Sequence, residues 1–305
     1  MTAADRRLAL VASLAILLVG AVVWWRWLLF YAYPIMHGNC TELHVTAQTA
    51  GSLGADEMVV LVMNLDRSKQ RLRVVSEELA RERISGWVRV PGIDKWTEVP
   101  SLHTRRRTTT GELVGRLLHG WRPLLIQRLF DGATPTNDSL VRAIEHDWAG
   151  KPEGHYIALT FTFLRALAQG LELHEKRTGR TGGPGWLLIV EDDLILRSSF
   201  RTRLAETARR LPRSDLIWLD HRAWSRAWWY GEPACCTVGM LVRVEAAPRI
   251  ARMMLPGSAQ VARYLARRSK PPLYDLVLSY LCVSEGLCCT VHDLMDQSNH
   301  VSKTR

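Results

Sequence analysis

Short apolar runs alternate with longer amphipathic stretches along this chain, a pattern that predicts strands alternating with helices. Strands are predicted at 58–63, 87–90, 187–190, 215–219 and 237–244. Helices are predicted at 156–175, 200–210, 246–255 and from 275 to about 282. A further helix follows the first strand, where Leu72, Val75 and Leu79 share one face. The strand–helix–strand opening therefore predicts an α/β domain with parallel, nucleotide-binding strands.

The N-terminal region has a different pattern. Leu8 to Trp25 contains no charged residue, and at 1.5 Å per residue these 18 residues form a helix of ~27 Å, close to the ~30 Å hydrocarbon core of a bilayer. Arg6 and Arg7 lie before it, which places the N-terminus in the cytosol. We predict a cytosolic tail at 1–7 and a transmembrane signal-anchor at 8–33. A cleaved signal peptide is the alternative, although its apolar region is usually shorter.

This orientation places the rest of the chain in the lumen of the endoplasmic reticulum or Golgi apparatus. We expect a polar stem at 34–57 and a single catalytic domain at 58–305. Two glycosylation sequons, beginning at Asn39 and Asn137, agree with a lumenal location. In an oxidising lumen some of the six cysteines should form disulfides, but the sequence does not choose among the 15 possible connectivities.

The charge balance narrows the choice of partners. There are 40 Lys and Arg residues against 30 Asp and Glu residues, a formal net charge of +10. A lumenal location argues against nucleic acid, whereas a basic surface attracts anionic sugar nucleotides or acidic glycans. The alternative is a general richness in arginine, with the basic residues on solvated faces.

The most informative polar motif is Glu191-Asp192-Asp193, which directly follows the predicted strand 187–190. Ligands of open α/β sheets bind beyond the carboxyl ends of strands. On an extended segment Glu191 and Asp193 point to the same side, so both can bind one Mg²⁺ or Mn²⁺ ion that bridges to a nucleotide diphosphate. The alternative is a solvated acidic turn.

Four blocks, in order, resemble glycosyltransferase family 25, which includes bacterial lipooligosaccharide and animal procollagen galactosyltransferases. The blocks are Val60–Arg71 with Asn-Leu-Asp-Arg, Trp87–Asp94, Leu188–Leu196 with Glu-Asp-Asp, and Gly239–Ala247 followed by Pro272–Asp275. The resemblance runs from about residue 58 to 302. The chain departs from the family at Ala158–Phe163, where family members usually carry Gly-Cys-x-x-Ser-His.

The resemblance implies a GT-A-like, nucleotide-binding mixed sheet flanked by helices, preceded here by the transmembrane helix. It implies an inverting hexosyltransferase that moves a hexose, galactose above all, from UDP-galactose to a glycan or glycoprotein acceptor with Mn²⁺ or Mg²⁺. Two alternatives stay open: a degenerate family member that binds a glycan or partner without turnover, and a transferase of another GT-A family.

The expected site residues follow from the motif and the resemblance together. Asp193 with Glu191 is expected to bind the metal ion, and Asp275 to be the catalytic base. The residues expected at the nucleotide sugar are Asn64, Leu65, Asp66, Arg71 and Asp192. The competing structural roles are helix capping for Asp66 and Asp275 and a plain surface charge for Arg71.

Overall fold

The computed structural model describes residues 13, 15–22, 35–37, 58–94, 154–180, 182–211, 213–220, 238–267 and 274–297. The chain divides into two units, Met1–Ile35 and Met36–Arg305. In the first unit, residues 13 and 15–22 are helical, and their large apolar side chains, such as Ile16 and Leu17, are exposed. No helix among the described residues is long and apolar enough to cross a membrane. The remainder of Leu8–Trp25, most of the stem and both sequons lie outside the described residues, so the signal-anchor stays a prediction.

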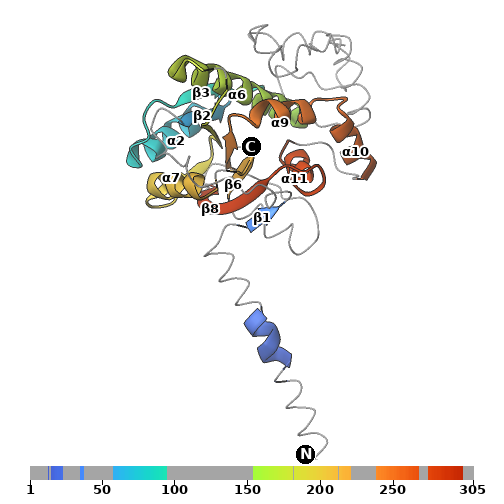
Figure 1. Ribbon diagram of the computed structural model, residues 1–305. Coiled ribbons are helices and arrows are strands. Elements are labelled where there is room, and N and C mark those ends of the chain that lie inside the picture. The colour runs from blue at the N-terminus through green and yellow to red at the C-terminus, as the bar shows by residue number, and fades with distance from the viewer. Residues whose placement is uncertain are drawn as a thin grey trace, which may run out of the picture. The chain divides into compact units, whose positions relative to one another are not determined.

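The second unit is built on a mixed sheet (Figure 1). Its strands are β1 (Ile35–His37), β2 (Met58–Asn64), β3 (Val88–Pro91), β4 (Trp186–Glu191), β5 (Leu194–Leu196), β6 (Leu216–Asp220), β7 (Gly239–Arg243) and β8 (Cys289–Gln297). The order is β1-β8-β6-β7-β4-β2-β3, and β5 pairs with β8. β2 is parallel to β3 and β4, whereas β7 is antiparallel to β4 and β6. The carboxyl ends of β2, β3, β4 and β6 therefore lie at the same edge of the sheet.

Helices cover both faces of this sheet, which explains why its central strands are apolar throughout. The described helices are α2 (Lys69–Arg81), α6 (Gly154–Thr178), α7 (Phe200–Arg210), α9 (Ala247–Met254), α10 (Ala259–Arg267) and α11 (Tyr274–Ser284). Along β2, Val59, Leu61 and Met63 pack with α6, α9, α10 and α11, while Val60 and Val62 pack with α2 and α7. These two cores hold the strand ends that carry the polar motifs.

One glycine sets the distance between α6 and the sheet. A Cβ atom on Gly170 would lie 2.8 Å from Leu61 Cδ1 and 2.9 Å from Leu187 Cδ1. Because real Cβ contacts are longer, any side chain there would push α6 away from β2 and β4. This close contact fixes the helix that forms one wall of the pocket described below.

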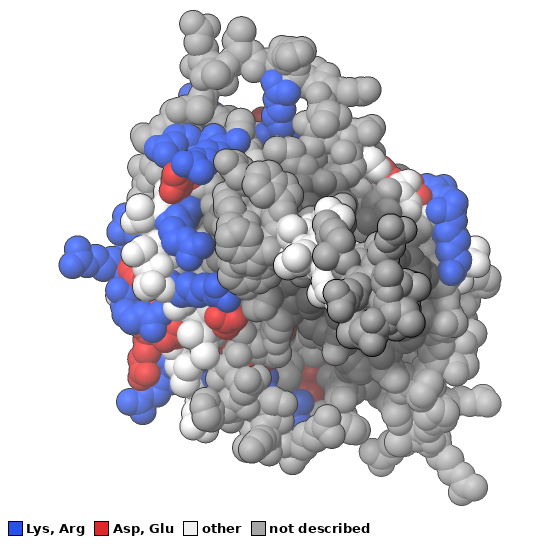
Figure 2. Space-filling view, turned by 90° about the horizontal axis from the view of Figure 1, so that it is seen from below, with Lys and Arg blue, Asp and Glu red and all other residues white. Residues whose placement is uncertain are grey.

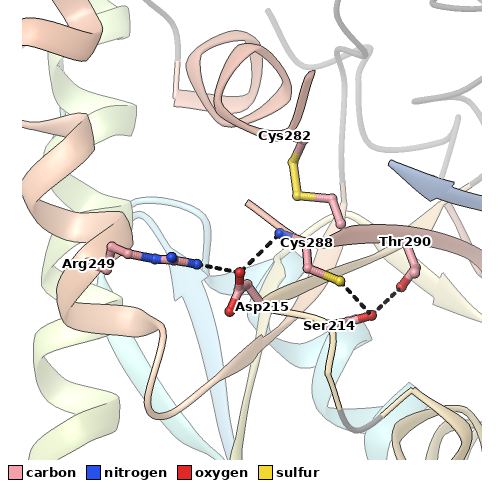
Figure 3. The surroundings of a disulfide bond; sticks show 7 residues. Ser214, Asp215, Arg249, Cys282, Cys288 and Thr290 are labelled. Carbon is pink, nitrogen blue, oxygen red and sulfur yellow. Dashed lines mark hydrogen bonds and ion pairs between the residues drawn. A yellow bond between two sulfur atoms is a disulfide. The ribbon is translucent and has the colours of Figure 1, made fainter. Parts of the chain in front are cut away.

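A disulfide and the buried Asp215 carboxylate link the C-terminal strands of the sheet to the neighbouring helices (Figure 3). Cys282 on α11 bonds to Cys289 on β8, and Cys288 is also disulfide-bonded. Asp215 accepts hydrogen bonds from Arg243 at 2.8 Å, from the Cys288 N–H group at 3.0 Å, and from Arg249. The carboxylate thus connects the start of β6 to β7, α9 and the segment before β8.

The sequence-based element boundaries agree closely with the structure where the pattern is strong. The helix 200–210 was predicted with the observed bounds of α7, and β2 is one residue longer than predicted. Four elements were not predicted: β1, which lies in the predicted stem, and β5, α10 and β8. β5 has three residues, and β8 mixes polar and apolar residues without a clear alternation, so neither carries a pattern that indicates a strand.

Candidate functional site

The pairing of β2 with β4 brings the two predicted polar motifs together. Met63 lies opposite Glu191, so Asn64 and Asp192 are the next residues at the sheet edge. Both are buried, with 3% and 8% of their surface exposed, and the Asn64 amide donates a 2.6 Å hydrogen bond to Asp192 Oδ2. The same amide nitrogen donates to the Ser68 carbonyl at 3.0 Å. Asn64 therefore orients the Asp192 carboxylate and the turn that enters α2.

Two arginines complete this cluster. Arg71, in the first turns of α2, lies 3.4 Å from the other oxygen of Asp192. Arg89 on β3 donates to Asn64 Oδ1 at 3.1 Å, to the Asn64 carbonyl at 3.2 Å, and to Asp66. Arg71 is thus part of the site rather than a plain surface charge. The role of Arg89 was missed, because a charged residue between two valines reads as the exposed face of a strand.

The environment acts on the protonation of Asp192. Burial raises the pKa of this carboxyl above its ordinary value, while the hydrogen bond from Asn64 and the charge of Arg71 act in the opposite direction. Burial is the stronger effect, and Asp193 adds to it. Asn64 and Arg71 are therefore the groups that favour the ionised form of a carboxylate that is otherwise poorly solvated.

Glu191 has a buried partner in Tyr274, at the start of α11, and the Tyr274 hydroxyl donates a hydrogen bond to Glu191 Oε1. The Tyr274 ring stacks on Phe163 of α6, with ring centroids 5.2 Å apart. Burial raises the pKa of Glu191 well above its ordinary value, and the charges of Asp193, Asp275 and Asp192 act in the same direction, whereas the Tyr274 hydrogen bond lowers it. The sequence pointed to Asp275 but not to its neighbour Tyr274.

The structure changes the geometric argument for a metal ion. β4 ends at Glu191 and the chain turns at Asp192 and Asp193, so the alternation of an extended strand does not apply to this pair. No group of three or more His, Cys, Asp or Glu residues in the described ranges could hold a metal ion. Asp193 is near enough to Glu191 for its charge to raise the pKa of Glu191, and two carboxylates with phosphate and water suit Mg²⁺ or Mn²⁺. The metal site stays a prediction.

A pocket of about 210 Å³ opens at this edge of the sheet. Five of the predicted residues line it: Asn64, Leu65, Arg71, Glu191 and Asp192. The lining also includes Arg67, and apolar groups of β2, α6 and the segment after β3. The pocket therefore combines an apolar wall with two guanidinium groups and two carboxyl groups.

Gly92 shapes this pocket. Its N–H group donates to the Asn64 carbonyl at 2.8 Å, and a Cβ atom there would lie 3.1 Å from Leu65 Cδ2. A side chain at this position would press on the Asn64–Leu65 segment. The segment after β3 can lie against the end of β2 because residue 92 has no side chain.

Three predicted residues lie outside the pocket lining, Asp66, Asp193 and Asp275, and neither Asp66 nor Asp275 is the N-cap residue of its helix. Asp66 has a side chain that is 84% exposed, and Ser68, not Asp66, is the N-cap residue of α2. Asp275 is the second residue of α11 and only 3% exposed, with Oδ1 accepting the Leu276 N–H at 2.8 Å. Asp275 therefore lies inside the first turn of its helix, near Glu191 and Tyr274.

Comparisons with known proteins add little to this geometry. No protein family model matches the chain, and no curated protein sequence matches it. Among solved structures it is similar to the apo form of mouse xyloside xylosyltransferase 1. The identity is 13%, the match covers 79% of this chain and 73% of the mouse chain, and the TM-score is 0.30. Because that score is low, the similarity carries no argument about fold or function.

Proposed function

We propose that this chain is a glycosyltransferase that binds a nucleotide-sugar donor where β2, β3 and β4 end. The observation that carries the proposal is the buried Asn64–Asp192 pair, held by Arg71 and Arg89, at the edge of a pocket. Ligands of α/β sheets bind at this end of parallel strands. The acidic motif and the first-strand motif, 128 positions apart in the chain, meet there.

The pocket offers a suitable partner for each part of a nucleotide sugar. Ile93 and Leu159 provide apolar surface for the nucleoside. Arg67 and Arg71 provide guanidinium groups for the diphosphate, although Arg67 also pairs with Asp94 at 3.0 Å. Asp192, oriented by its two partners, accepts hydrogen bonds from hydroxyl groups of the ribose or the sugar. UDP-galactose is the donor that the family resemblance favours.

The proposed reaction is a single displacement with inversion. The acceptor hydroxyl oxygen forms a bond to the anomeric carbon, the bond from that carbon to the phosphate oxygen breaks, and its electron pair leaves with the diphosphate. Asp275 takes the hydroxyl proton. Glu191 and Asp193 would hold Mn²⁺ or Mg²⁺, which supplies positive charge to the departing diphosphate. Tyr274 keeps Glu191 oriented through its hydroxyl hydrogen bond.

The first experiment is calorimetric titration of the full-length protein with uridine diphosphate, with and without Mn²⁺. We expect binding by the wild type, loss of binding in Asp192→Ala, and little change in the control Asp66→Ala, whose side chain is exposed. Equal affinity in Asp192→Ala and wild type would refute the assignment of the pocket.

The second experiment separates turnover from binding, with hydrolysis of nucleotide sugars as the readout. Asp275→Asn keeps the size and the local hydrogen-bond acceptor but removes the basic oxygen. We expect nearly unchanged nucleotide binding and a kcat at least ~100-fold lower. A parallel loss of stability and kcat would identify Asp275 as a structural residue instead.

A second candidate is a protein of the same fold that binds the donor or a glycan without turnover. Two observations favour it: Phe163 occupies the position of the family's histidine and packs in the core, and Asp275 is buried. Nucleotide binding without hydrolysis of any nucleotide sugar would support this candidate over the first.

We also propose that the domain works in the lumen of the Golgi apparatus or endoplasmic reticulum, as a single-pass type II membrane protein that acts on a glycan or glycoprotein. The support is the uncharged segment Leu8–Trp25 and the two preceding arginines. Full-length protein should stay with membranes in alkaline carbonate. Release into the soluble fraction would indicate a cleaved signal peptide.

A further inference from the structure

A second concave surface lies away from the nucleotide pocket, where α2 ends and α7 begins. This groove has a volume of about 740 Å³ and is lined by four arginines, Arg81, Arg83, Arg201 and Arg209, and by the hydroxyl-bearing residues Ser199 and Thr202. Arg81 is ten positions after Arg71, which corresponds to about 15 Å along the helix axis. The groove is therefore separate from the pocket that contains Arg71 and Asp192.

Two of the four arginines are held by the fold itself. Arg81 donates to the Leu196 carbonyl and pairs with Glu78 at 2.8 Å. Arg201 donates to the Arg83 carbonyl at 3.1 Å. In the part of the chain that the structure describes, the guanidinium groups of Arg83 and Arg209 have no ion-pair partner, and both residues are exposed. These two charges are available to a ligand.

The backbone at Arg83 is the second observation. Arg83 has φ of 55°, and its N–H and that of Ile84 bond back to the carbonyls of Ala80 and Leu79. This helix-ending geometry favours glycine, because other residues are strained at positive φ. Ser199, across the groove, has φ of 59°, and these are the two non-glycine residues with positive φ among those described. Strained residues of this kind gather at functional sites.

The lining determines which ligand chemistry fits. None of the described lining residues is aromatic, so the groove lacks the stacking surface that single-stranded nucleic acids use. Ala205 is its apolar residue among those described, which argues against an apolar peptide. Guanidinium, hydroxyl and carboxylate groups, the last from Glu82 and Glu206, match a ligand that carries both negative charges and many hydroxyl groups.

We propose that this groove binds an acidic oligosaccharide, with Arg83 and Arg209 contacting its sulfate or carboxylate groups. Figure 2 shows Lys and Arg side chains gathered, with some Asp and Glu, on the side where α2 and α7 lie in Figure 1. A volume of about 740 Å³ is within the range of sites for ligands larger than a single anion. The site is distinct from the donor pocket, and the proposal holds whether or not the chain transfers sugars.

The test measures binding of a sulfated, heparin-derived octasaccharide to the full-length protein without any nucleotide. The double variant Arg83→Gln/Arg209→Gln removes the two available charges. The double variant Arg73→Gln/Arg180→Gln is its charge-matched control, because both residues are exposed and neither lines the groove. Because each charge-assisted contact contributes roughly tenfold, we expect the first variant to bind at least about tenfold more weakly and the control to stay within about threefold of wild type.

Three results would overturn the proposal. The first is no binding of the octasaccharide by the wild-type protein. The second is an equal loss of affinity in both double variants, which would show that net charge and not the groove governs binding. The third is a single-stranded oligonucleotide of equal charge that binds as tightly and is equally sensitive to Arg83→Gln/Arg209→Gln, which would show that the groove does not recognise sugars. Unchanged circular dichroism confirms that each variant is folded.

Discussion

Replacing Asn64 by alanine is the sharpest test of the candidate site, because the Asn64 side chain forms hydrogen bonds with three other residues, Asp192, Ser68 and Arg89. Its amide nitrogen donates to Asp192 at 2.6 Å and to the Ser68 carbonyl at 3.0 Å, and its oxygen accepts from Arg89 at 3.1 Å. The residue is 3% exposed, so water cannot easily replace these bonds. Truncation leaves the buried Asp192 carboxylate with Arg71, at 3.4 Å, as its remaining partner within the site.

The magnitude follows from the three bonds. A hydrogen bond to a charged group contributes about 1.5–3 kcal/mol to stability, and a neutral one about 1 kcal/mol. Arg89 keeps its contacts to the residue 64 carbonyl and to Asp66, so its loss is small. We expect Asn64→Ala to lower the free energy of unfolding by about 2–4 kcal/mol at pH 7.5. With m near 3 kcal/mol/M, this moves the urea midpoint by about 1 M.

The pH dependence gives a second readout. Burial raises the folded pKa of Asp192 above its ordinary value of 3.8, so the folded state binds a proton that the unfolded state has already released. Stability is therefore lost as pH rises from 3.8 through the folded pKa. Asn64→Ala removes the hydrogen bond that lowers this pKa, so the variant should lose stability more steeply. At pH 4, where Asp192 is more protonated, the variant should lie closer to wild type.

The assay is urea unfolding followed by circular dichroism at pH 4 and pH 7.5, with Asp66→Ala as the control. The Asp66 side chain is 84% exposed and pairs with Arg89, so its removal should change stability by no more than about 0.5 kcal/mol. A loss below about 1 kcal/mol for Asn64→Ala at pH 7.5, or an equal loss at both pH values, would refute the idea that Asn64 supports an ionised Asp192.

Three further predictions concern other parts of the unit. Glu191→Gln keeps an acceptor for the Tyr274 hydroxyl and removes a buried charge. Because the folded pKa of Glu191 is raised well above 4.5, the wild-type protein loses stability as pH rises. The variant should therefore be more stable than wild type at pH 8 in urea unfolding, and the opposite order would contradict the burial argument. Arg83→Gly removes the strain of positive φ and should raise the free energy of unfolding, measured by urea unfolding, by about 1 kcal/mol. A decrease would show that the Arg83 side chain stabilises the fold. Replacing Cys282 and Cys289 together by alanine opens a loop with a sequence separation of 7 and should lower the free energy of unfolding by about 2–3 kcal/mol. This difference should vanish when the wild type and the variant are both measured under fully reducing conditions.

The sequence itself determined the elements in which apolar residues recur with a regular spacing. The apolar runs that form β2, β4, β6 and β7 are buried on both faces. The spacing of Leu72, Val75 and Leu79 specifies which face of α2 meets the sheet, and Val75 and Leu79 are fully buried there. The position of Glu191, Asp192 and Asp193 at a strand end also follows from local pattern, because a buried apolar run must stop where consecutive charges begin.

The contacts within the site were decided by the tertiary structure. Asn64 and Asp192 are 128 positions apart, and Tyr274 and Glu191 are 83 apart. Such pairs depend on the neighbours and register of each strand, and a shift of one residue would turn every side chain to the opposite face. No local pattern carries that information. For this reason the sequence indicated several polar residues of the candidate site but not Arg89 or Tyr274, and only the pairing of β2 with β4 and the packing of α11 showed which residues meet.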